Sequence, residues 1–134
     1  MEVMLDTNVL FSAILFPSGH MNELFRELIQ NHRVVLCSFS LEELYSVTER
    51  KAPNKLRAIE IFLQKLPYRL VHSPRANLID VDFNLRDAED YPILQSAVLA
   101  DVDILITGDK DFDDVTLDRP EIMSPSGFMS VYGA

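Results

Sequence analysis

The stretch that decides the fold is Met4-Leu5-Asp6-Thr7-Asn8-Val9-Leu10, close to the start of the chain. The apolar residues Val3 to Leu5 suffice only for a short buried strand, and Asp6 follows them directly. Apolar residues then return at helical spacing from Val9, so the stretch predicts a strand, a carboxylate and a helix. In an open parallel sheet, such a carboxylate lies at the edge where ligands bind. The simpler alternative is that Asp6 only caps the next helix.

The rest of the chain repeats this alternation of short apolar strands and amphipathic helices. It predicts parallel βαβ units, right-handed crossovers and a three-layer α/β domain, with all strand exits along one edge of the sheet. Residues 73–86 lack periodicity and are expected to be loop, and only a short terminal segment is expected after Pro125. The expected strands span residues 3–5, 34–37, 68–71, 104–106 and 121–124, and the expected helices residues 9–14, 21–29, 41–48, 56–66 and 90–98.

Composition narrows the class of protein. The 134 residues are 48% apolar, which suits a single domain over residues 1–134 with one core. The sequence shows no signal peptide, and no apolar run approaches the ~20 residues of a membrane span. The lone Cys37 cannot form an internal disulfide. We therefore expect a cytoplasmic protein that is not embedded in a membrane.

The charge is acidic but unevenly distributed. A formal net charge of −9 argues mildly against broad binding of nucleic acid through its phosphates. Most of the bases, however, lie between residues 50 and 75, where they form either an ordinary solvated helix face or a track for phosphates. The bases of this segment are Arg50, Lys51, Lys55, Arg57, Lys65, Arg69 and Arg75.

Four acids are expected to meet at the carboxyl edge of the sheet. Asp6 follows the first strand, Glu43 lies near the start of the helix after the second, Asp90 begins the helix before the fourth, and Asp109 follows the fourth. Each alone could be a helix cap, a turn residue or, for Glu43, the partner of Ser40 in a Ser-x-x-Glu capping box. Ser38 or Ser40 is expected to cap the helix that carries Glu43. Together, however, converging carboxylates repel one another without a cation. A hard divalent ion with oxygen ligands resolves this conflict and favours phosphate chemistry.

No rival chemistry is visible in the sequence. It contains no H-E-x-x-H zinc motif, paired CxxC, P-loop, G-x-G-x-x-G turn or G-x-S-x-G elbow. The three histidines, His20, His32 and His72, lack the spacing of metal ligands and are expected to be ordinary, and His20 is the one most expected to line a cleft.

Four segments in this order resemble the PIN domain, and within it the branch of toxin components of toxin–antitoxin systems, relatives of VapC-type toxins. The similarity covers essentially the whole chain, and the ordered set is specific although each segment alone is weak. One departure is Asp87-Ala88, where this branch typically has Asp-Pro. The segments are L-D-T-N-V-L (5–10), S-F-S-L-E-E-L (38–44), D-A-E-D-Y-P-I-L (87–94) and I-T-G-D-K-D-F (106–112), and the tail I-M-S-P-S-G-F (122–128) also resembles that branch.

The resemblance implies a three-layer α/β/α PIN-like fold with a parallel five-stranded sheet. It also implies a ribonuclease that depends on Mg²⁺ or Mn²⁺ and leaves a 5′-phosphate and a 3′-hydroxyl. In this family pattern the catalytic and metal-holding acids are Asp6, Glu43, Asp90 and Asp109, a further metal ligand is Asp111, and Asn8 and Thr107 are polar residues that support the site.

The resemblance also implies partners. An antitoxin protein would accompany a toxin, and family members often form homodimers. The helix over residues 53–66 carries more apolar residues than one face needs, because Ile61 lies off its main stripe. This helix is therefore either a wide core-facing helix or a contact for a second copy or an antitoxin.

Two other functions remain open from the sequence. A phosphotransfer domain is disfavoured because Asn8 replaces the second Asp of a D-x-D phosphatase motif, and the third strand carries no phosphoacceptor Asp for a receiver domain. A non-catalytic interaction module could use the same fold, since fold does not fix function.

Overall fold

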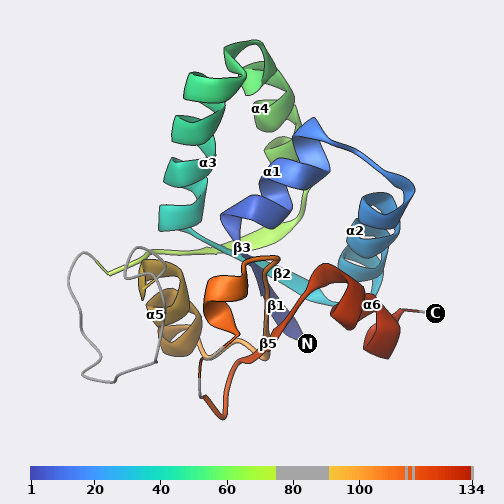
Figure 1. Ribbon diagram of the computed structural model, residues 1–134, viewed down its shortest axis with the longest axis vertical. Helices are drawn as coiled ribbons and strands as arrows, with labels where there is room; N and C mark the ends of the chain where they lie inside the picture. Colours follow the sequence, from blue (N-terminus) through green and yellow to red (C-terminus); the bar gives the residue numbers. More distant parts are fainter. Residues whose placement is uncertain (75–90, 114, 116, 134) are drawn as a thin grey trace.

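A computed structural model describes residues 1–74, 91–113, 115 and 117–133 of the chain (Figure 1). Asp90 and most of the loop expected over residues 73–86 fall outside these ranges. Within them, no helix combines the length and the apolar character needed to cross a bilayer. The strands are β1 (Glu2–Leu5), β2 (Arg33–Cys37), β3 (Tyr68–Val71), β4 (Ile104–Ile106) and β5 (Glu121–Met123). The helices are α1 (Thr7–Leu15), α2 (Gly19–Asn31), α3 (Ser38–Lys51), α4 (Leu56–Lys65), α5 (Tyr91–Leu99) and α6 (Pro125–Tyr132), with short 3-10 helices η1 (Pro53–Lys55) and η3 (Lys110–Phe112).

The five strands form one parallel sheet in the order β3-β2-β1-β4-β5. Met4 of the central strand β1 lies opposite Val35 of β2 and Leu105 of β4. The chain places β2 and β3 on one side of β1 and then β4 and β5 on the other, so the order reverses between β1 and β4. Open α/β sheets bind ligands beyond the carboxyl ends of strands at such a reversal. The predicted five-stranded parallel sheet is confirmed.

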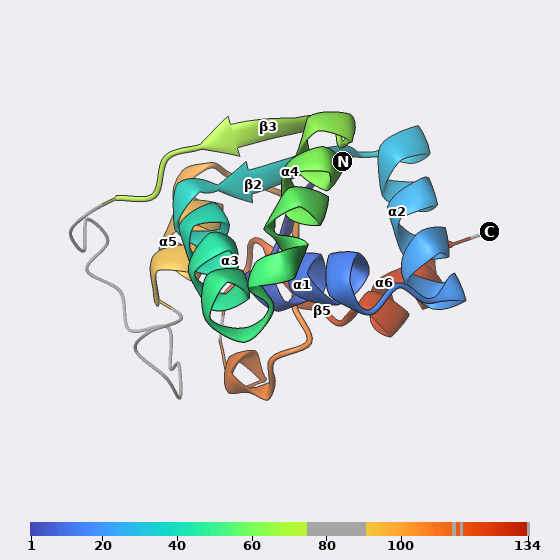
Figure 2. The ribbon, with the colours of Figure 1, turned by 90° about the horizontal axis from the view of Figure 1, so that it is seen from above.

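Both faces of the central strands β1, β2 and β4 are buried, and successive side chains of a strand point to opposite sides of the sheet. Val3 and Leu5 of β1 pack in the core formed with α1, α2, α3, α4 and α6, whereas Met4 packs in the core formed with α5 and the segment after β4. Strands covered on both faces are continuous apolar runs, as are residues 3–5, 34–37 and 104–106 of this sequence. The three-layer arrangement predicted from the sequence is therefore confirmed, and Figure 2 shows β2 and β3 side by side in the same direction.

The chain ends in a helix, α6, where the sequence predicted only a short terminal segment. The hydroxyl of Ser124 accepts a hydrogen bond from the N–H of Gly127 at 3.0 Å, and Pro125 occupies the first helical position, where its missing N–H does no harm. α6 lies beside α2 (Figures 1 and 2), and the ring of its buried Phe128 contacts His32 edge-on. This packing explains why so short a segment is helical.

The predicted cap of α3 is wrong. The sequence favoured Ser38 or Ser40 as the capping residue, but β2 continues into α3 without an intervening residue, so Cys37 occupies the N-cap position and makes no capping bond. Ser40 lies inside the helix, and its hydroxyl contacts the thiol of Cys37 at 3.3 Å. The alternative of a Ser40–Glu43 capping box is therefore wrong as well.

Candidate functional site

Asp6 lies at the carboxyl end of β1, next to the reversal of strand order. Its backbone N–H continues the sheet by donating to the carbonyl of Ile106 at 3.0 Å. Its side chain serves as the N-cap of α1, since Oδ1 accepts from the N–H of Thr7 at 2.7 Å. Only 4% of the residue is exposed. The capping alternative from the sequence is thus correct but incomplete, because a cap alone does not require a buried carboxylate.

Thr107 joins the ends of β1 and β4. Its hydroxyl donates to Oδ2 of Asp6 at 2.7 Å and accepts from the backbone N–H of Asp109 at 3.0 Å. The second bond occupies the oxygen as an acceptor, so the single hydroxyl proton points to the carboxylate. Thr107 therefore fixes both the orientation of Asp6 and the turn that carries Asp109, as expected of a residue that supports the site.

Glu43 and Asp109 come close enough to Asp6 to act on its charge. Burial raises the pKa of Asp6 from 3.8 to about 6, and the negative charges of Glu43 and Asp109 add to this increase. The hydrogen bonds from Thr107 and Thr7 oppose it. Glu43 comes from α3 and Asp109 from the turn after β4, and both are half-buried. Three acids that are far apart in the sequence thus share one electrostatic environment.

A hollow of about 600 Å³ opens on the β4–β5 side of this edge. Its lining includes Thr107, Gly108 and Asp109, which follow β4, and Met123 and Ser124 at the end of β5. The carboxyl ends of two neighbouring strands therefore form one wall of a space that a ligand could enter.

The remaining predicted site residues are less well placed or lie outside the described ranges. Asn8 is exposed on the first turn of α1, and its side chain makes no hydrogen bond within the described part of the chain. Asp111 belongs to η3, but its side chain is not among those described, and Asp90 lies outside the described residues. Among the residues described, no three His, Cys, Asp or Glu side chains are grouped closely enough to hold one metal ion.

A network of serines that the sequence did not predict ties the layers together near this edge. Ser73, just after β3, donates its N–H to the hydroxyl of Ser38 at 2.8 Å, and its own hydroxyl accepts from the N–H of Phe39 at 3.1 Å. The hydroxyl of Ser96 on α5 contacts that of Ser73 at 2.9 Å. The network fixes the start of α3 relative to α5. The hydrogen-bonded residues are 23 to 35 positions apart in the sequence, so no local sequence pattern predicts the network.

The sequence matches the family model described as a PIN domain over residues 2–111. The chain belongs to the PIN-domain family. No protein with a curated description matches the sequence. Among solved structures, one similar chain belongs to the crystal structure of VapBC2 from Rickettsia felis bound to a DNA fragment from their promoter. The two chains share 18% identity and a TM-score of 0.69, and the alignment covers 92% of this chain and 98% of the other.

The resemblance to the PIN domain is therefore confirmed at the level of family and fold. At 18% identity, the likeness to the VapBC2 chain establishes the fold alone. The range that matches the PIN-domain model contains every residue assigned to the site from the sequence, from Asp6 to Asp111.

Proposed function

We propose that this PIN-domain chain is a metal-dependent endoribonuclease that hydrolyses phosphodiester bonds of RNA. The observation that carries the proposal is the position of Asp6, which is buried at the reversal of strand order beside Glu43 and Asp109. A pKa of about 6 means that near neutral pH the charged carboxylate is poorly stabilised by the protein alone. A divalent cation supplies the missing positive charge, and Mg²⁺ and Mn²⁺ prefer carboxylate oxygens.

The carboxylates near Asp6 are suitable ligands for such an ion. Mg²⁺ takes one or two protein carboxylates and keeps several waters, so a close group of three acids is not required. When bound, the ion lowers the pKa of a water to produce a nucleophile and offsets negative charge on the phosphate. One or two of the carboxylates of Asp6, Glu43 and Asp109 would hold the ion, and the sequence-predicted ligands Asp90 and Asp111 are the further candidates.

The chain's own residues hold the carboxylate in place. Oδ1 of Asp6 is bound by the N–H of Thr7 and Oδ2 by the hydroxyl of Thr107, and each oxygen keeps a further lone pair for a cation. Because both bonds come from the ends of rigid elements, the carboxylate needs little reorganisation when a ligand arrives. Asn8, which is exposed beside Asp6, is free to contact the RNA or a water on it.

We further propose that the protein is the toxin of a toxin–antitoxin pair and acts in the cytoplasm as one domain. Support comes from the family and from the shared fold with a chain of the VapBC2 complex. An antitoxin partner and a homodimer both need apolar surface, and Ile61 of α4 leaves 38% of its surface exposed. We place one of these contacts on α4.

A cleavage assay with a mixed RNA pool and Mn²⁺ tests the proposed activity. The wild type is expected to cut the RNA, and Glu43→Gln to lose at least about tenfold in rate, because a charge near the reacting phosphate is removed. Glu49→Gln is a matched control, since it makes the same change at an exposed position of the same helix and leaves the rate unchanged. Absence of cleavage by the wild type, together with absence of heat on titration with Mn²⁺, would favour a non-catalytic module instead.

Thr107→Val is expected to lower the rate of RNA cleavage about 10- to 100-fold, because it removes the donor that orients Asp6. The loss of that donor also raises the pKa of Asp6 further. Thr107→Ser keeps the hydroxyl and is expected to retain most of the activity. Initial cleavage rates of the three proteins provide the measurement.

Thr7→Val is the matched control for this change. The hydroxyl of Thr7 is buried and has no hydrogen-bond partner among the described residues, so its removal breaks no bond. We expect wild-type activity and equal or higher stability. An equal loss in Thr7→Val and Thr107→Val, or in Thr107→Ser and Thr107→Val, would contradict the role given to the Thr107 hydroxyl.

A further inference from the structure

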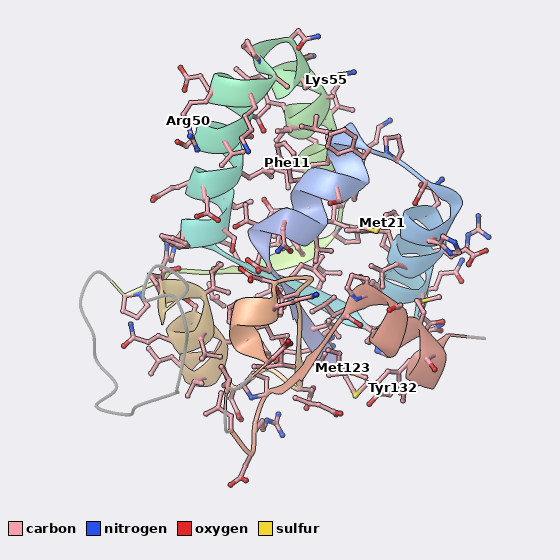
Figure 3. All side chains as sticks on the ribbon, in the orientation of Figure 1. Phe11, Met21, Arg50, Lys55, Met123 and Tyr132 are labelled. Atoms are coloured by element: carbon pink, nitrogen blue, oxygen red, sulfur yellow. The ribbon has the colours of Figure 1, made fainter. Side chains whose placement is uncertain are left out.

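α3 carries Glu43 near the sheet and a group of bases at its far end. Arg50 follows Glu43 by seven residues, which is two helical turns, or about 10.5 Å, on nearly the same face. Lys51 ends the helix, and Lys55 ends the short η1 that follows. We call Arg50, Lys51 and Lys55 the α3–α4 tip. Figure 3 shows Arg50 and Lys55 on the part of the α3–α4 hairpin that is far from the sheet.

The bases of the tip are exposed, and none of them forms an ion pair within the described part of the chain. Three other bases of this acidic protein do have carboxylate partners. Arg26, Arg33 and Lys65 also form no ion pair within the described ranges, but they lie on three different elements and not at one tip. Arg57 pairs with Glu60 at 3.2 Å, and Arg69 with Glu2 at 2.9 Å. Arg119 likewise bridges two aspartates near the amino ends of the strands. The tip is therefore a concentration of uncompensated positive charge on a chain of net charge −9.

The simplest structural explanation covers only part of the tip. Bases in the last turn of a helix stabilise its dipole, which accounts for Arg50 and Lys51. The effect falls off within that turn and so does not account for Lys55, which lies beyond the helix. A dipole role also predicts a change in stability on substitution, whereas a binding role predicts a change in affinity for a polyanion.

We propose that the α3–α4 tip binds phosphates of the RNA strand on one side of the cleaved bond. This inference rests on the proposed nuclease function and adds the path of the substrate. Glu43 and Arg50 lie on one helix face, so a strand whose phosphate lies beside Glu43 can run along α3 to the tip. A single RNA strand presents a row of phosphates, and Lys and Arg attract it without reading its sequence.

The test compares two triple variants that lose the same charge. In the first, Arg50, Lys51 and Lys55 are changed to Gln, and in the second Arg26, Arg33 and Lys65, which are exposed bases elsewhere, are changed to Gln. Binding of a labelled single-stranded RNA of mixed sequence is measured in EDTA, where no cleavage occurs, over a series of KCl concentrations. Thermal unfolding of each protein checks the fold.

The triple variant of the α3–α4 tip (the tip triple) is expected to bind the RNA at least about tenfold more weakly at low salt than the wild type. Three lost phosphate contacts would reduce the slope of log K against log [KCl] by about 2. The control triple should stay within about twofold of the wild type. In Mn²⁺, the tip triple should raise KM for a long RNA and leave kcat nearly unchanged, whereas Glu43→Gln lowers kcat.

Equal losses of affinity in both triples would overturn the proposal, because net charge alone would then explain binding. So would an unchanged salt slope in the tip triple, or no RNA binding by the wild type. A tip triple that keeps its RNA affinity but loses affinity for a polyglutamate peptide would also overturn it and assign the surface to an acidic protein segment. Tip-dependent RNA binding by a wild type that cleaves nothing in Mn²⁺ would uphold the RNA surface and defeat the nuclease function.

Discussion

Asp6→Asn is expected to lower the rate of RNA cleavage by about 10³-fold or more. Asn is nearly isosteric but lacks the negative charge that a divalent cation requires, and cation stabilisation of the phosphate contributes several kcal/mol to such reactions. Each 1.36 kcal/mol corresponds to a factor of ten in rate. The amide oxygen can still accept from the N–H of Thr7, so the cap of α1 is kept. The measurement is the initial rate of RNA cleavage in Mg²⁺ and in Mn²⁺.

Asp101→Asn is the matched control for this substitution. Asp101 lies near the amino ends of the strands, pairs with Arg119, and has a φ of 55°, a conformation that Asn adopts readily. We expect its cleavage rate to match that of the wild type. Retention of more than about a tenth of the activity by a folded Asp6→Asn protein would show that Asp6 does not hold the catalytic ion.

Without metal, the wild type is expected to lose about 3 kcal/mol of its free energy of unfolding through Asp6 as the pH rises from about 4 to about 7. The pKa of Asp6 is about 6 in the folded protein and 3.8 when unperturbed, and each unit is equivalent to 1.36 kcal/mol. Because the folded pKa is the higher one, the contribution is fully present below pH 3.8 and is lost as the pH rises through 6. Mg²⁺ or Mn²⁺ should restore stability at pH 7.5.

Urea unfolding in EDTA at pH 4.5 and pH 7.5 measures this contribution when the wild type is compared with Asp6→Asn. The difference between the two proteins removes the other titrating groups, which they share. We expect the stability of Asp6→Asn relative to the wild type to increase toward pH 7.5. Parallel pH dependences of the two proteins would contradict the buried, charge-crowded environment assigned to Asp6.

The sequence predicted the elements of this fold well, because apolar periodicity determines which segments can bury a face. All five strands were found within about one residue, and η1 lies between the two helices expected over residues 41–48 and 56–66. The helix after Ser124 was not predicted, although Ser followed by Pro is a signal for the start of a helix. The side-by-side order of the strands could not be read from the sequence, because pairing depends on contacts between distant segments.

The candidate site was predicted only in part, because sequence patterns reveal local features but not contacts between distant segments. A carboxylate at or shortly after the end of a strand is a local signal, and it placed Asp6 and Asp109 at one edge of the sheet. The role of Thr107 came from the family resemblance, and only the fold shows that its hydroxyl joins Asp6 to the β4 turn. The serine network around Ser73 could not be predicted from the sequence, because it joins residues that are far apart along the chain.

Isothermal titration calorimetry with Mn²⁺ at pH 7.5 tests most directly whether the acids around Asp6 hold a divalent ion. The wild type is expected to release heat with a saturating isotherm, and Asp6→Asn to lose that binding while Asp101→Asn keeps it. Absence of binding by the wild type, or equal binding by Asp6→Asn, would contradict the metal site on which the proposed function depends.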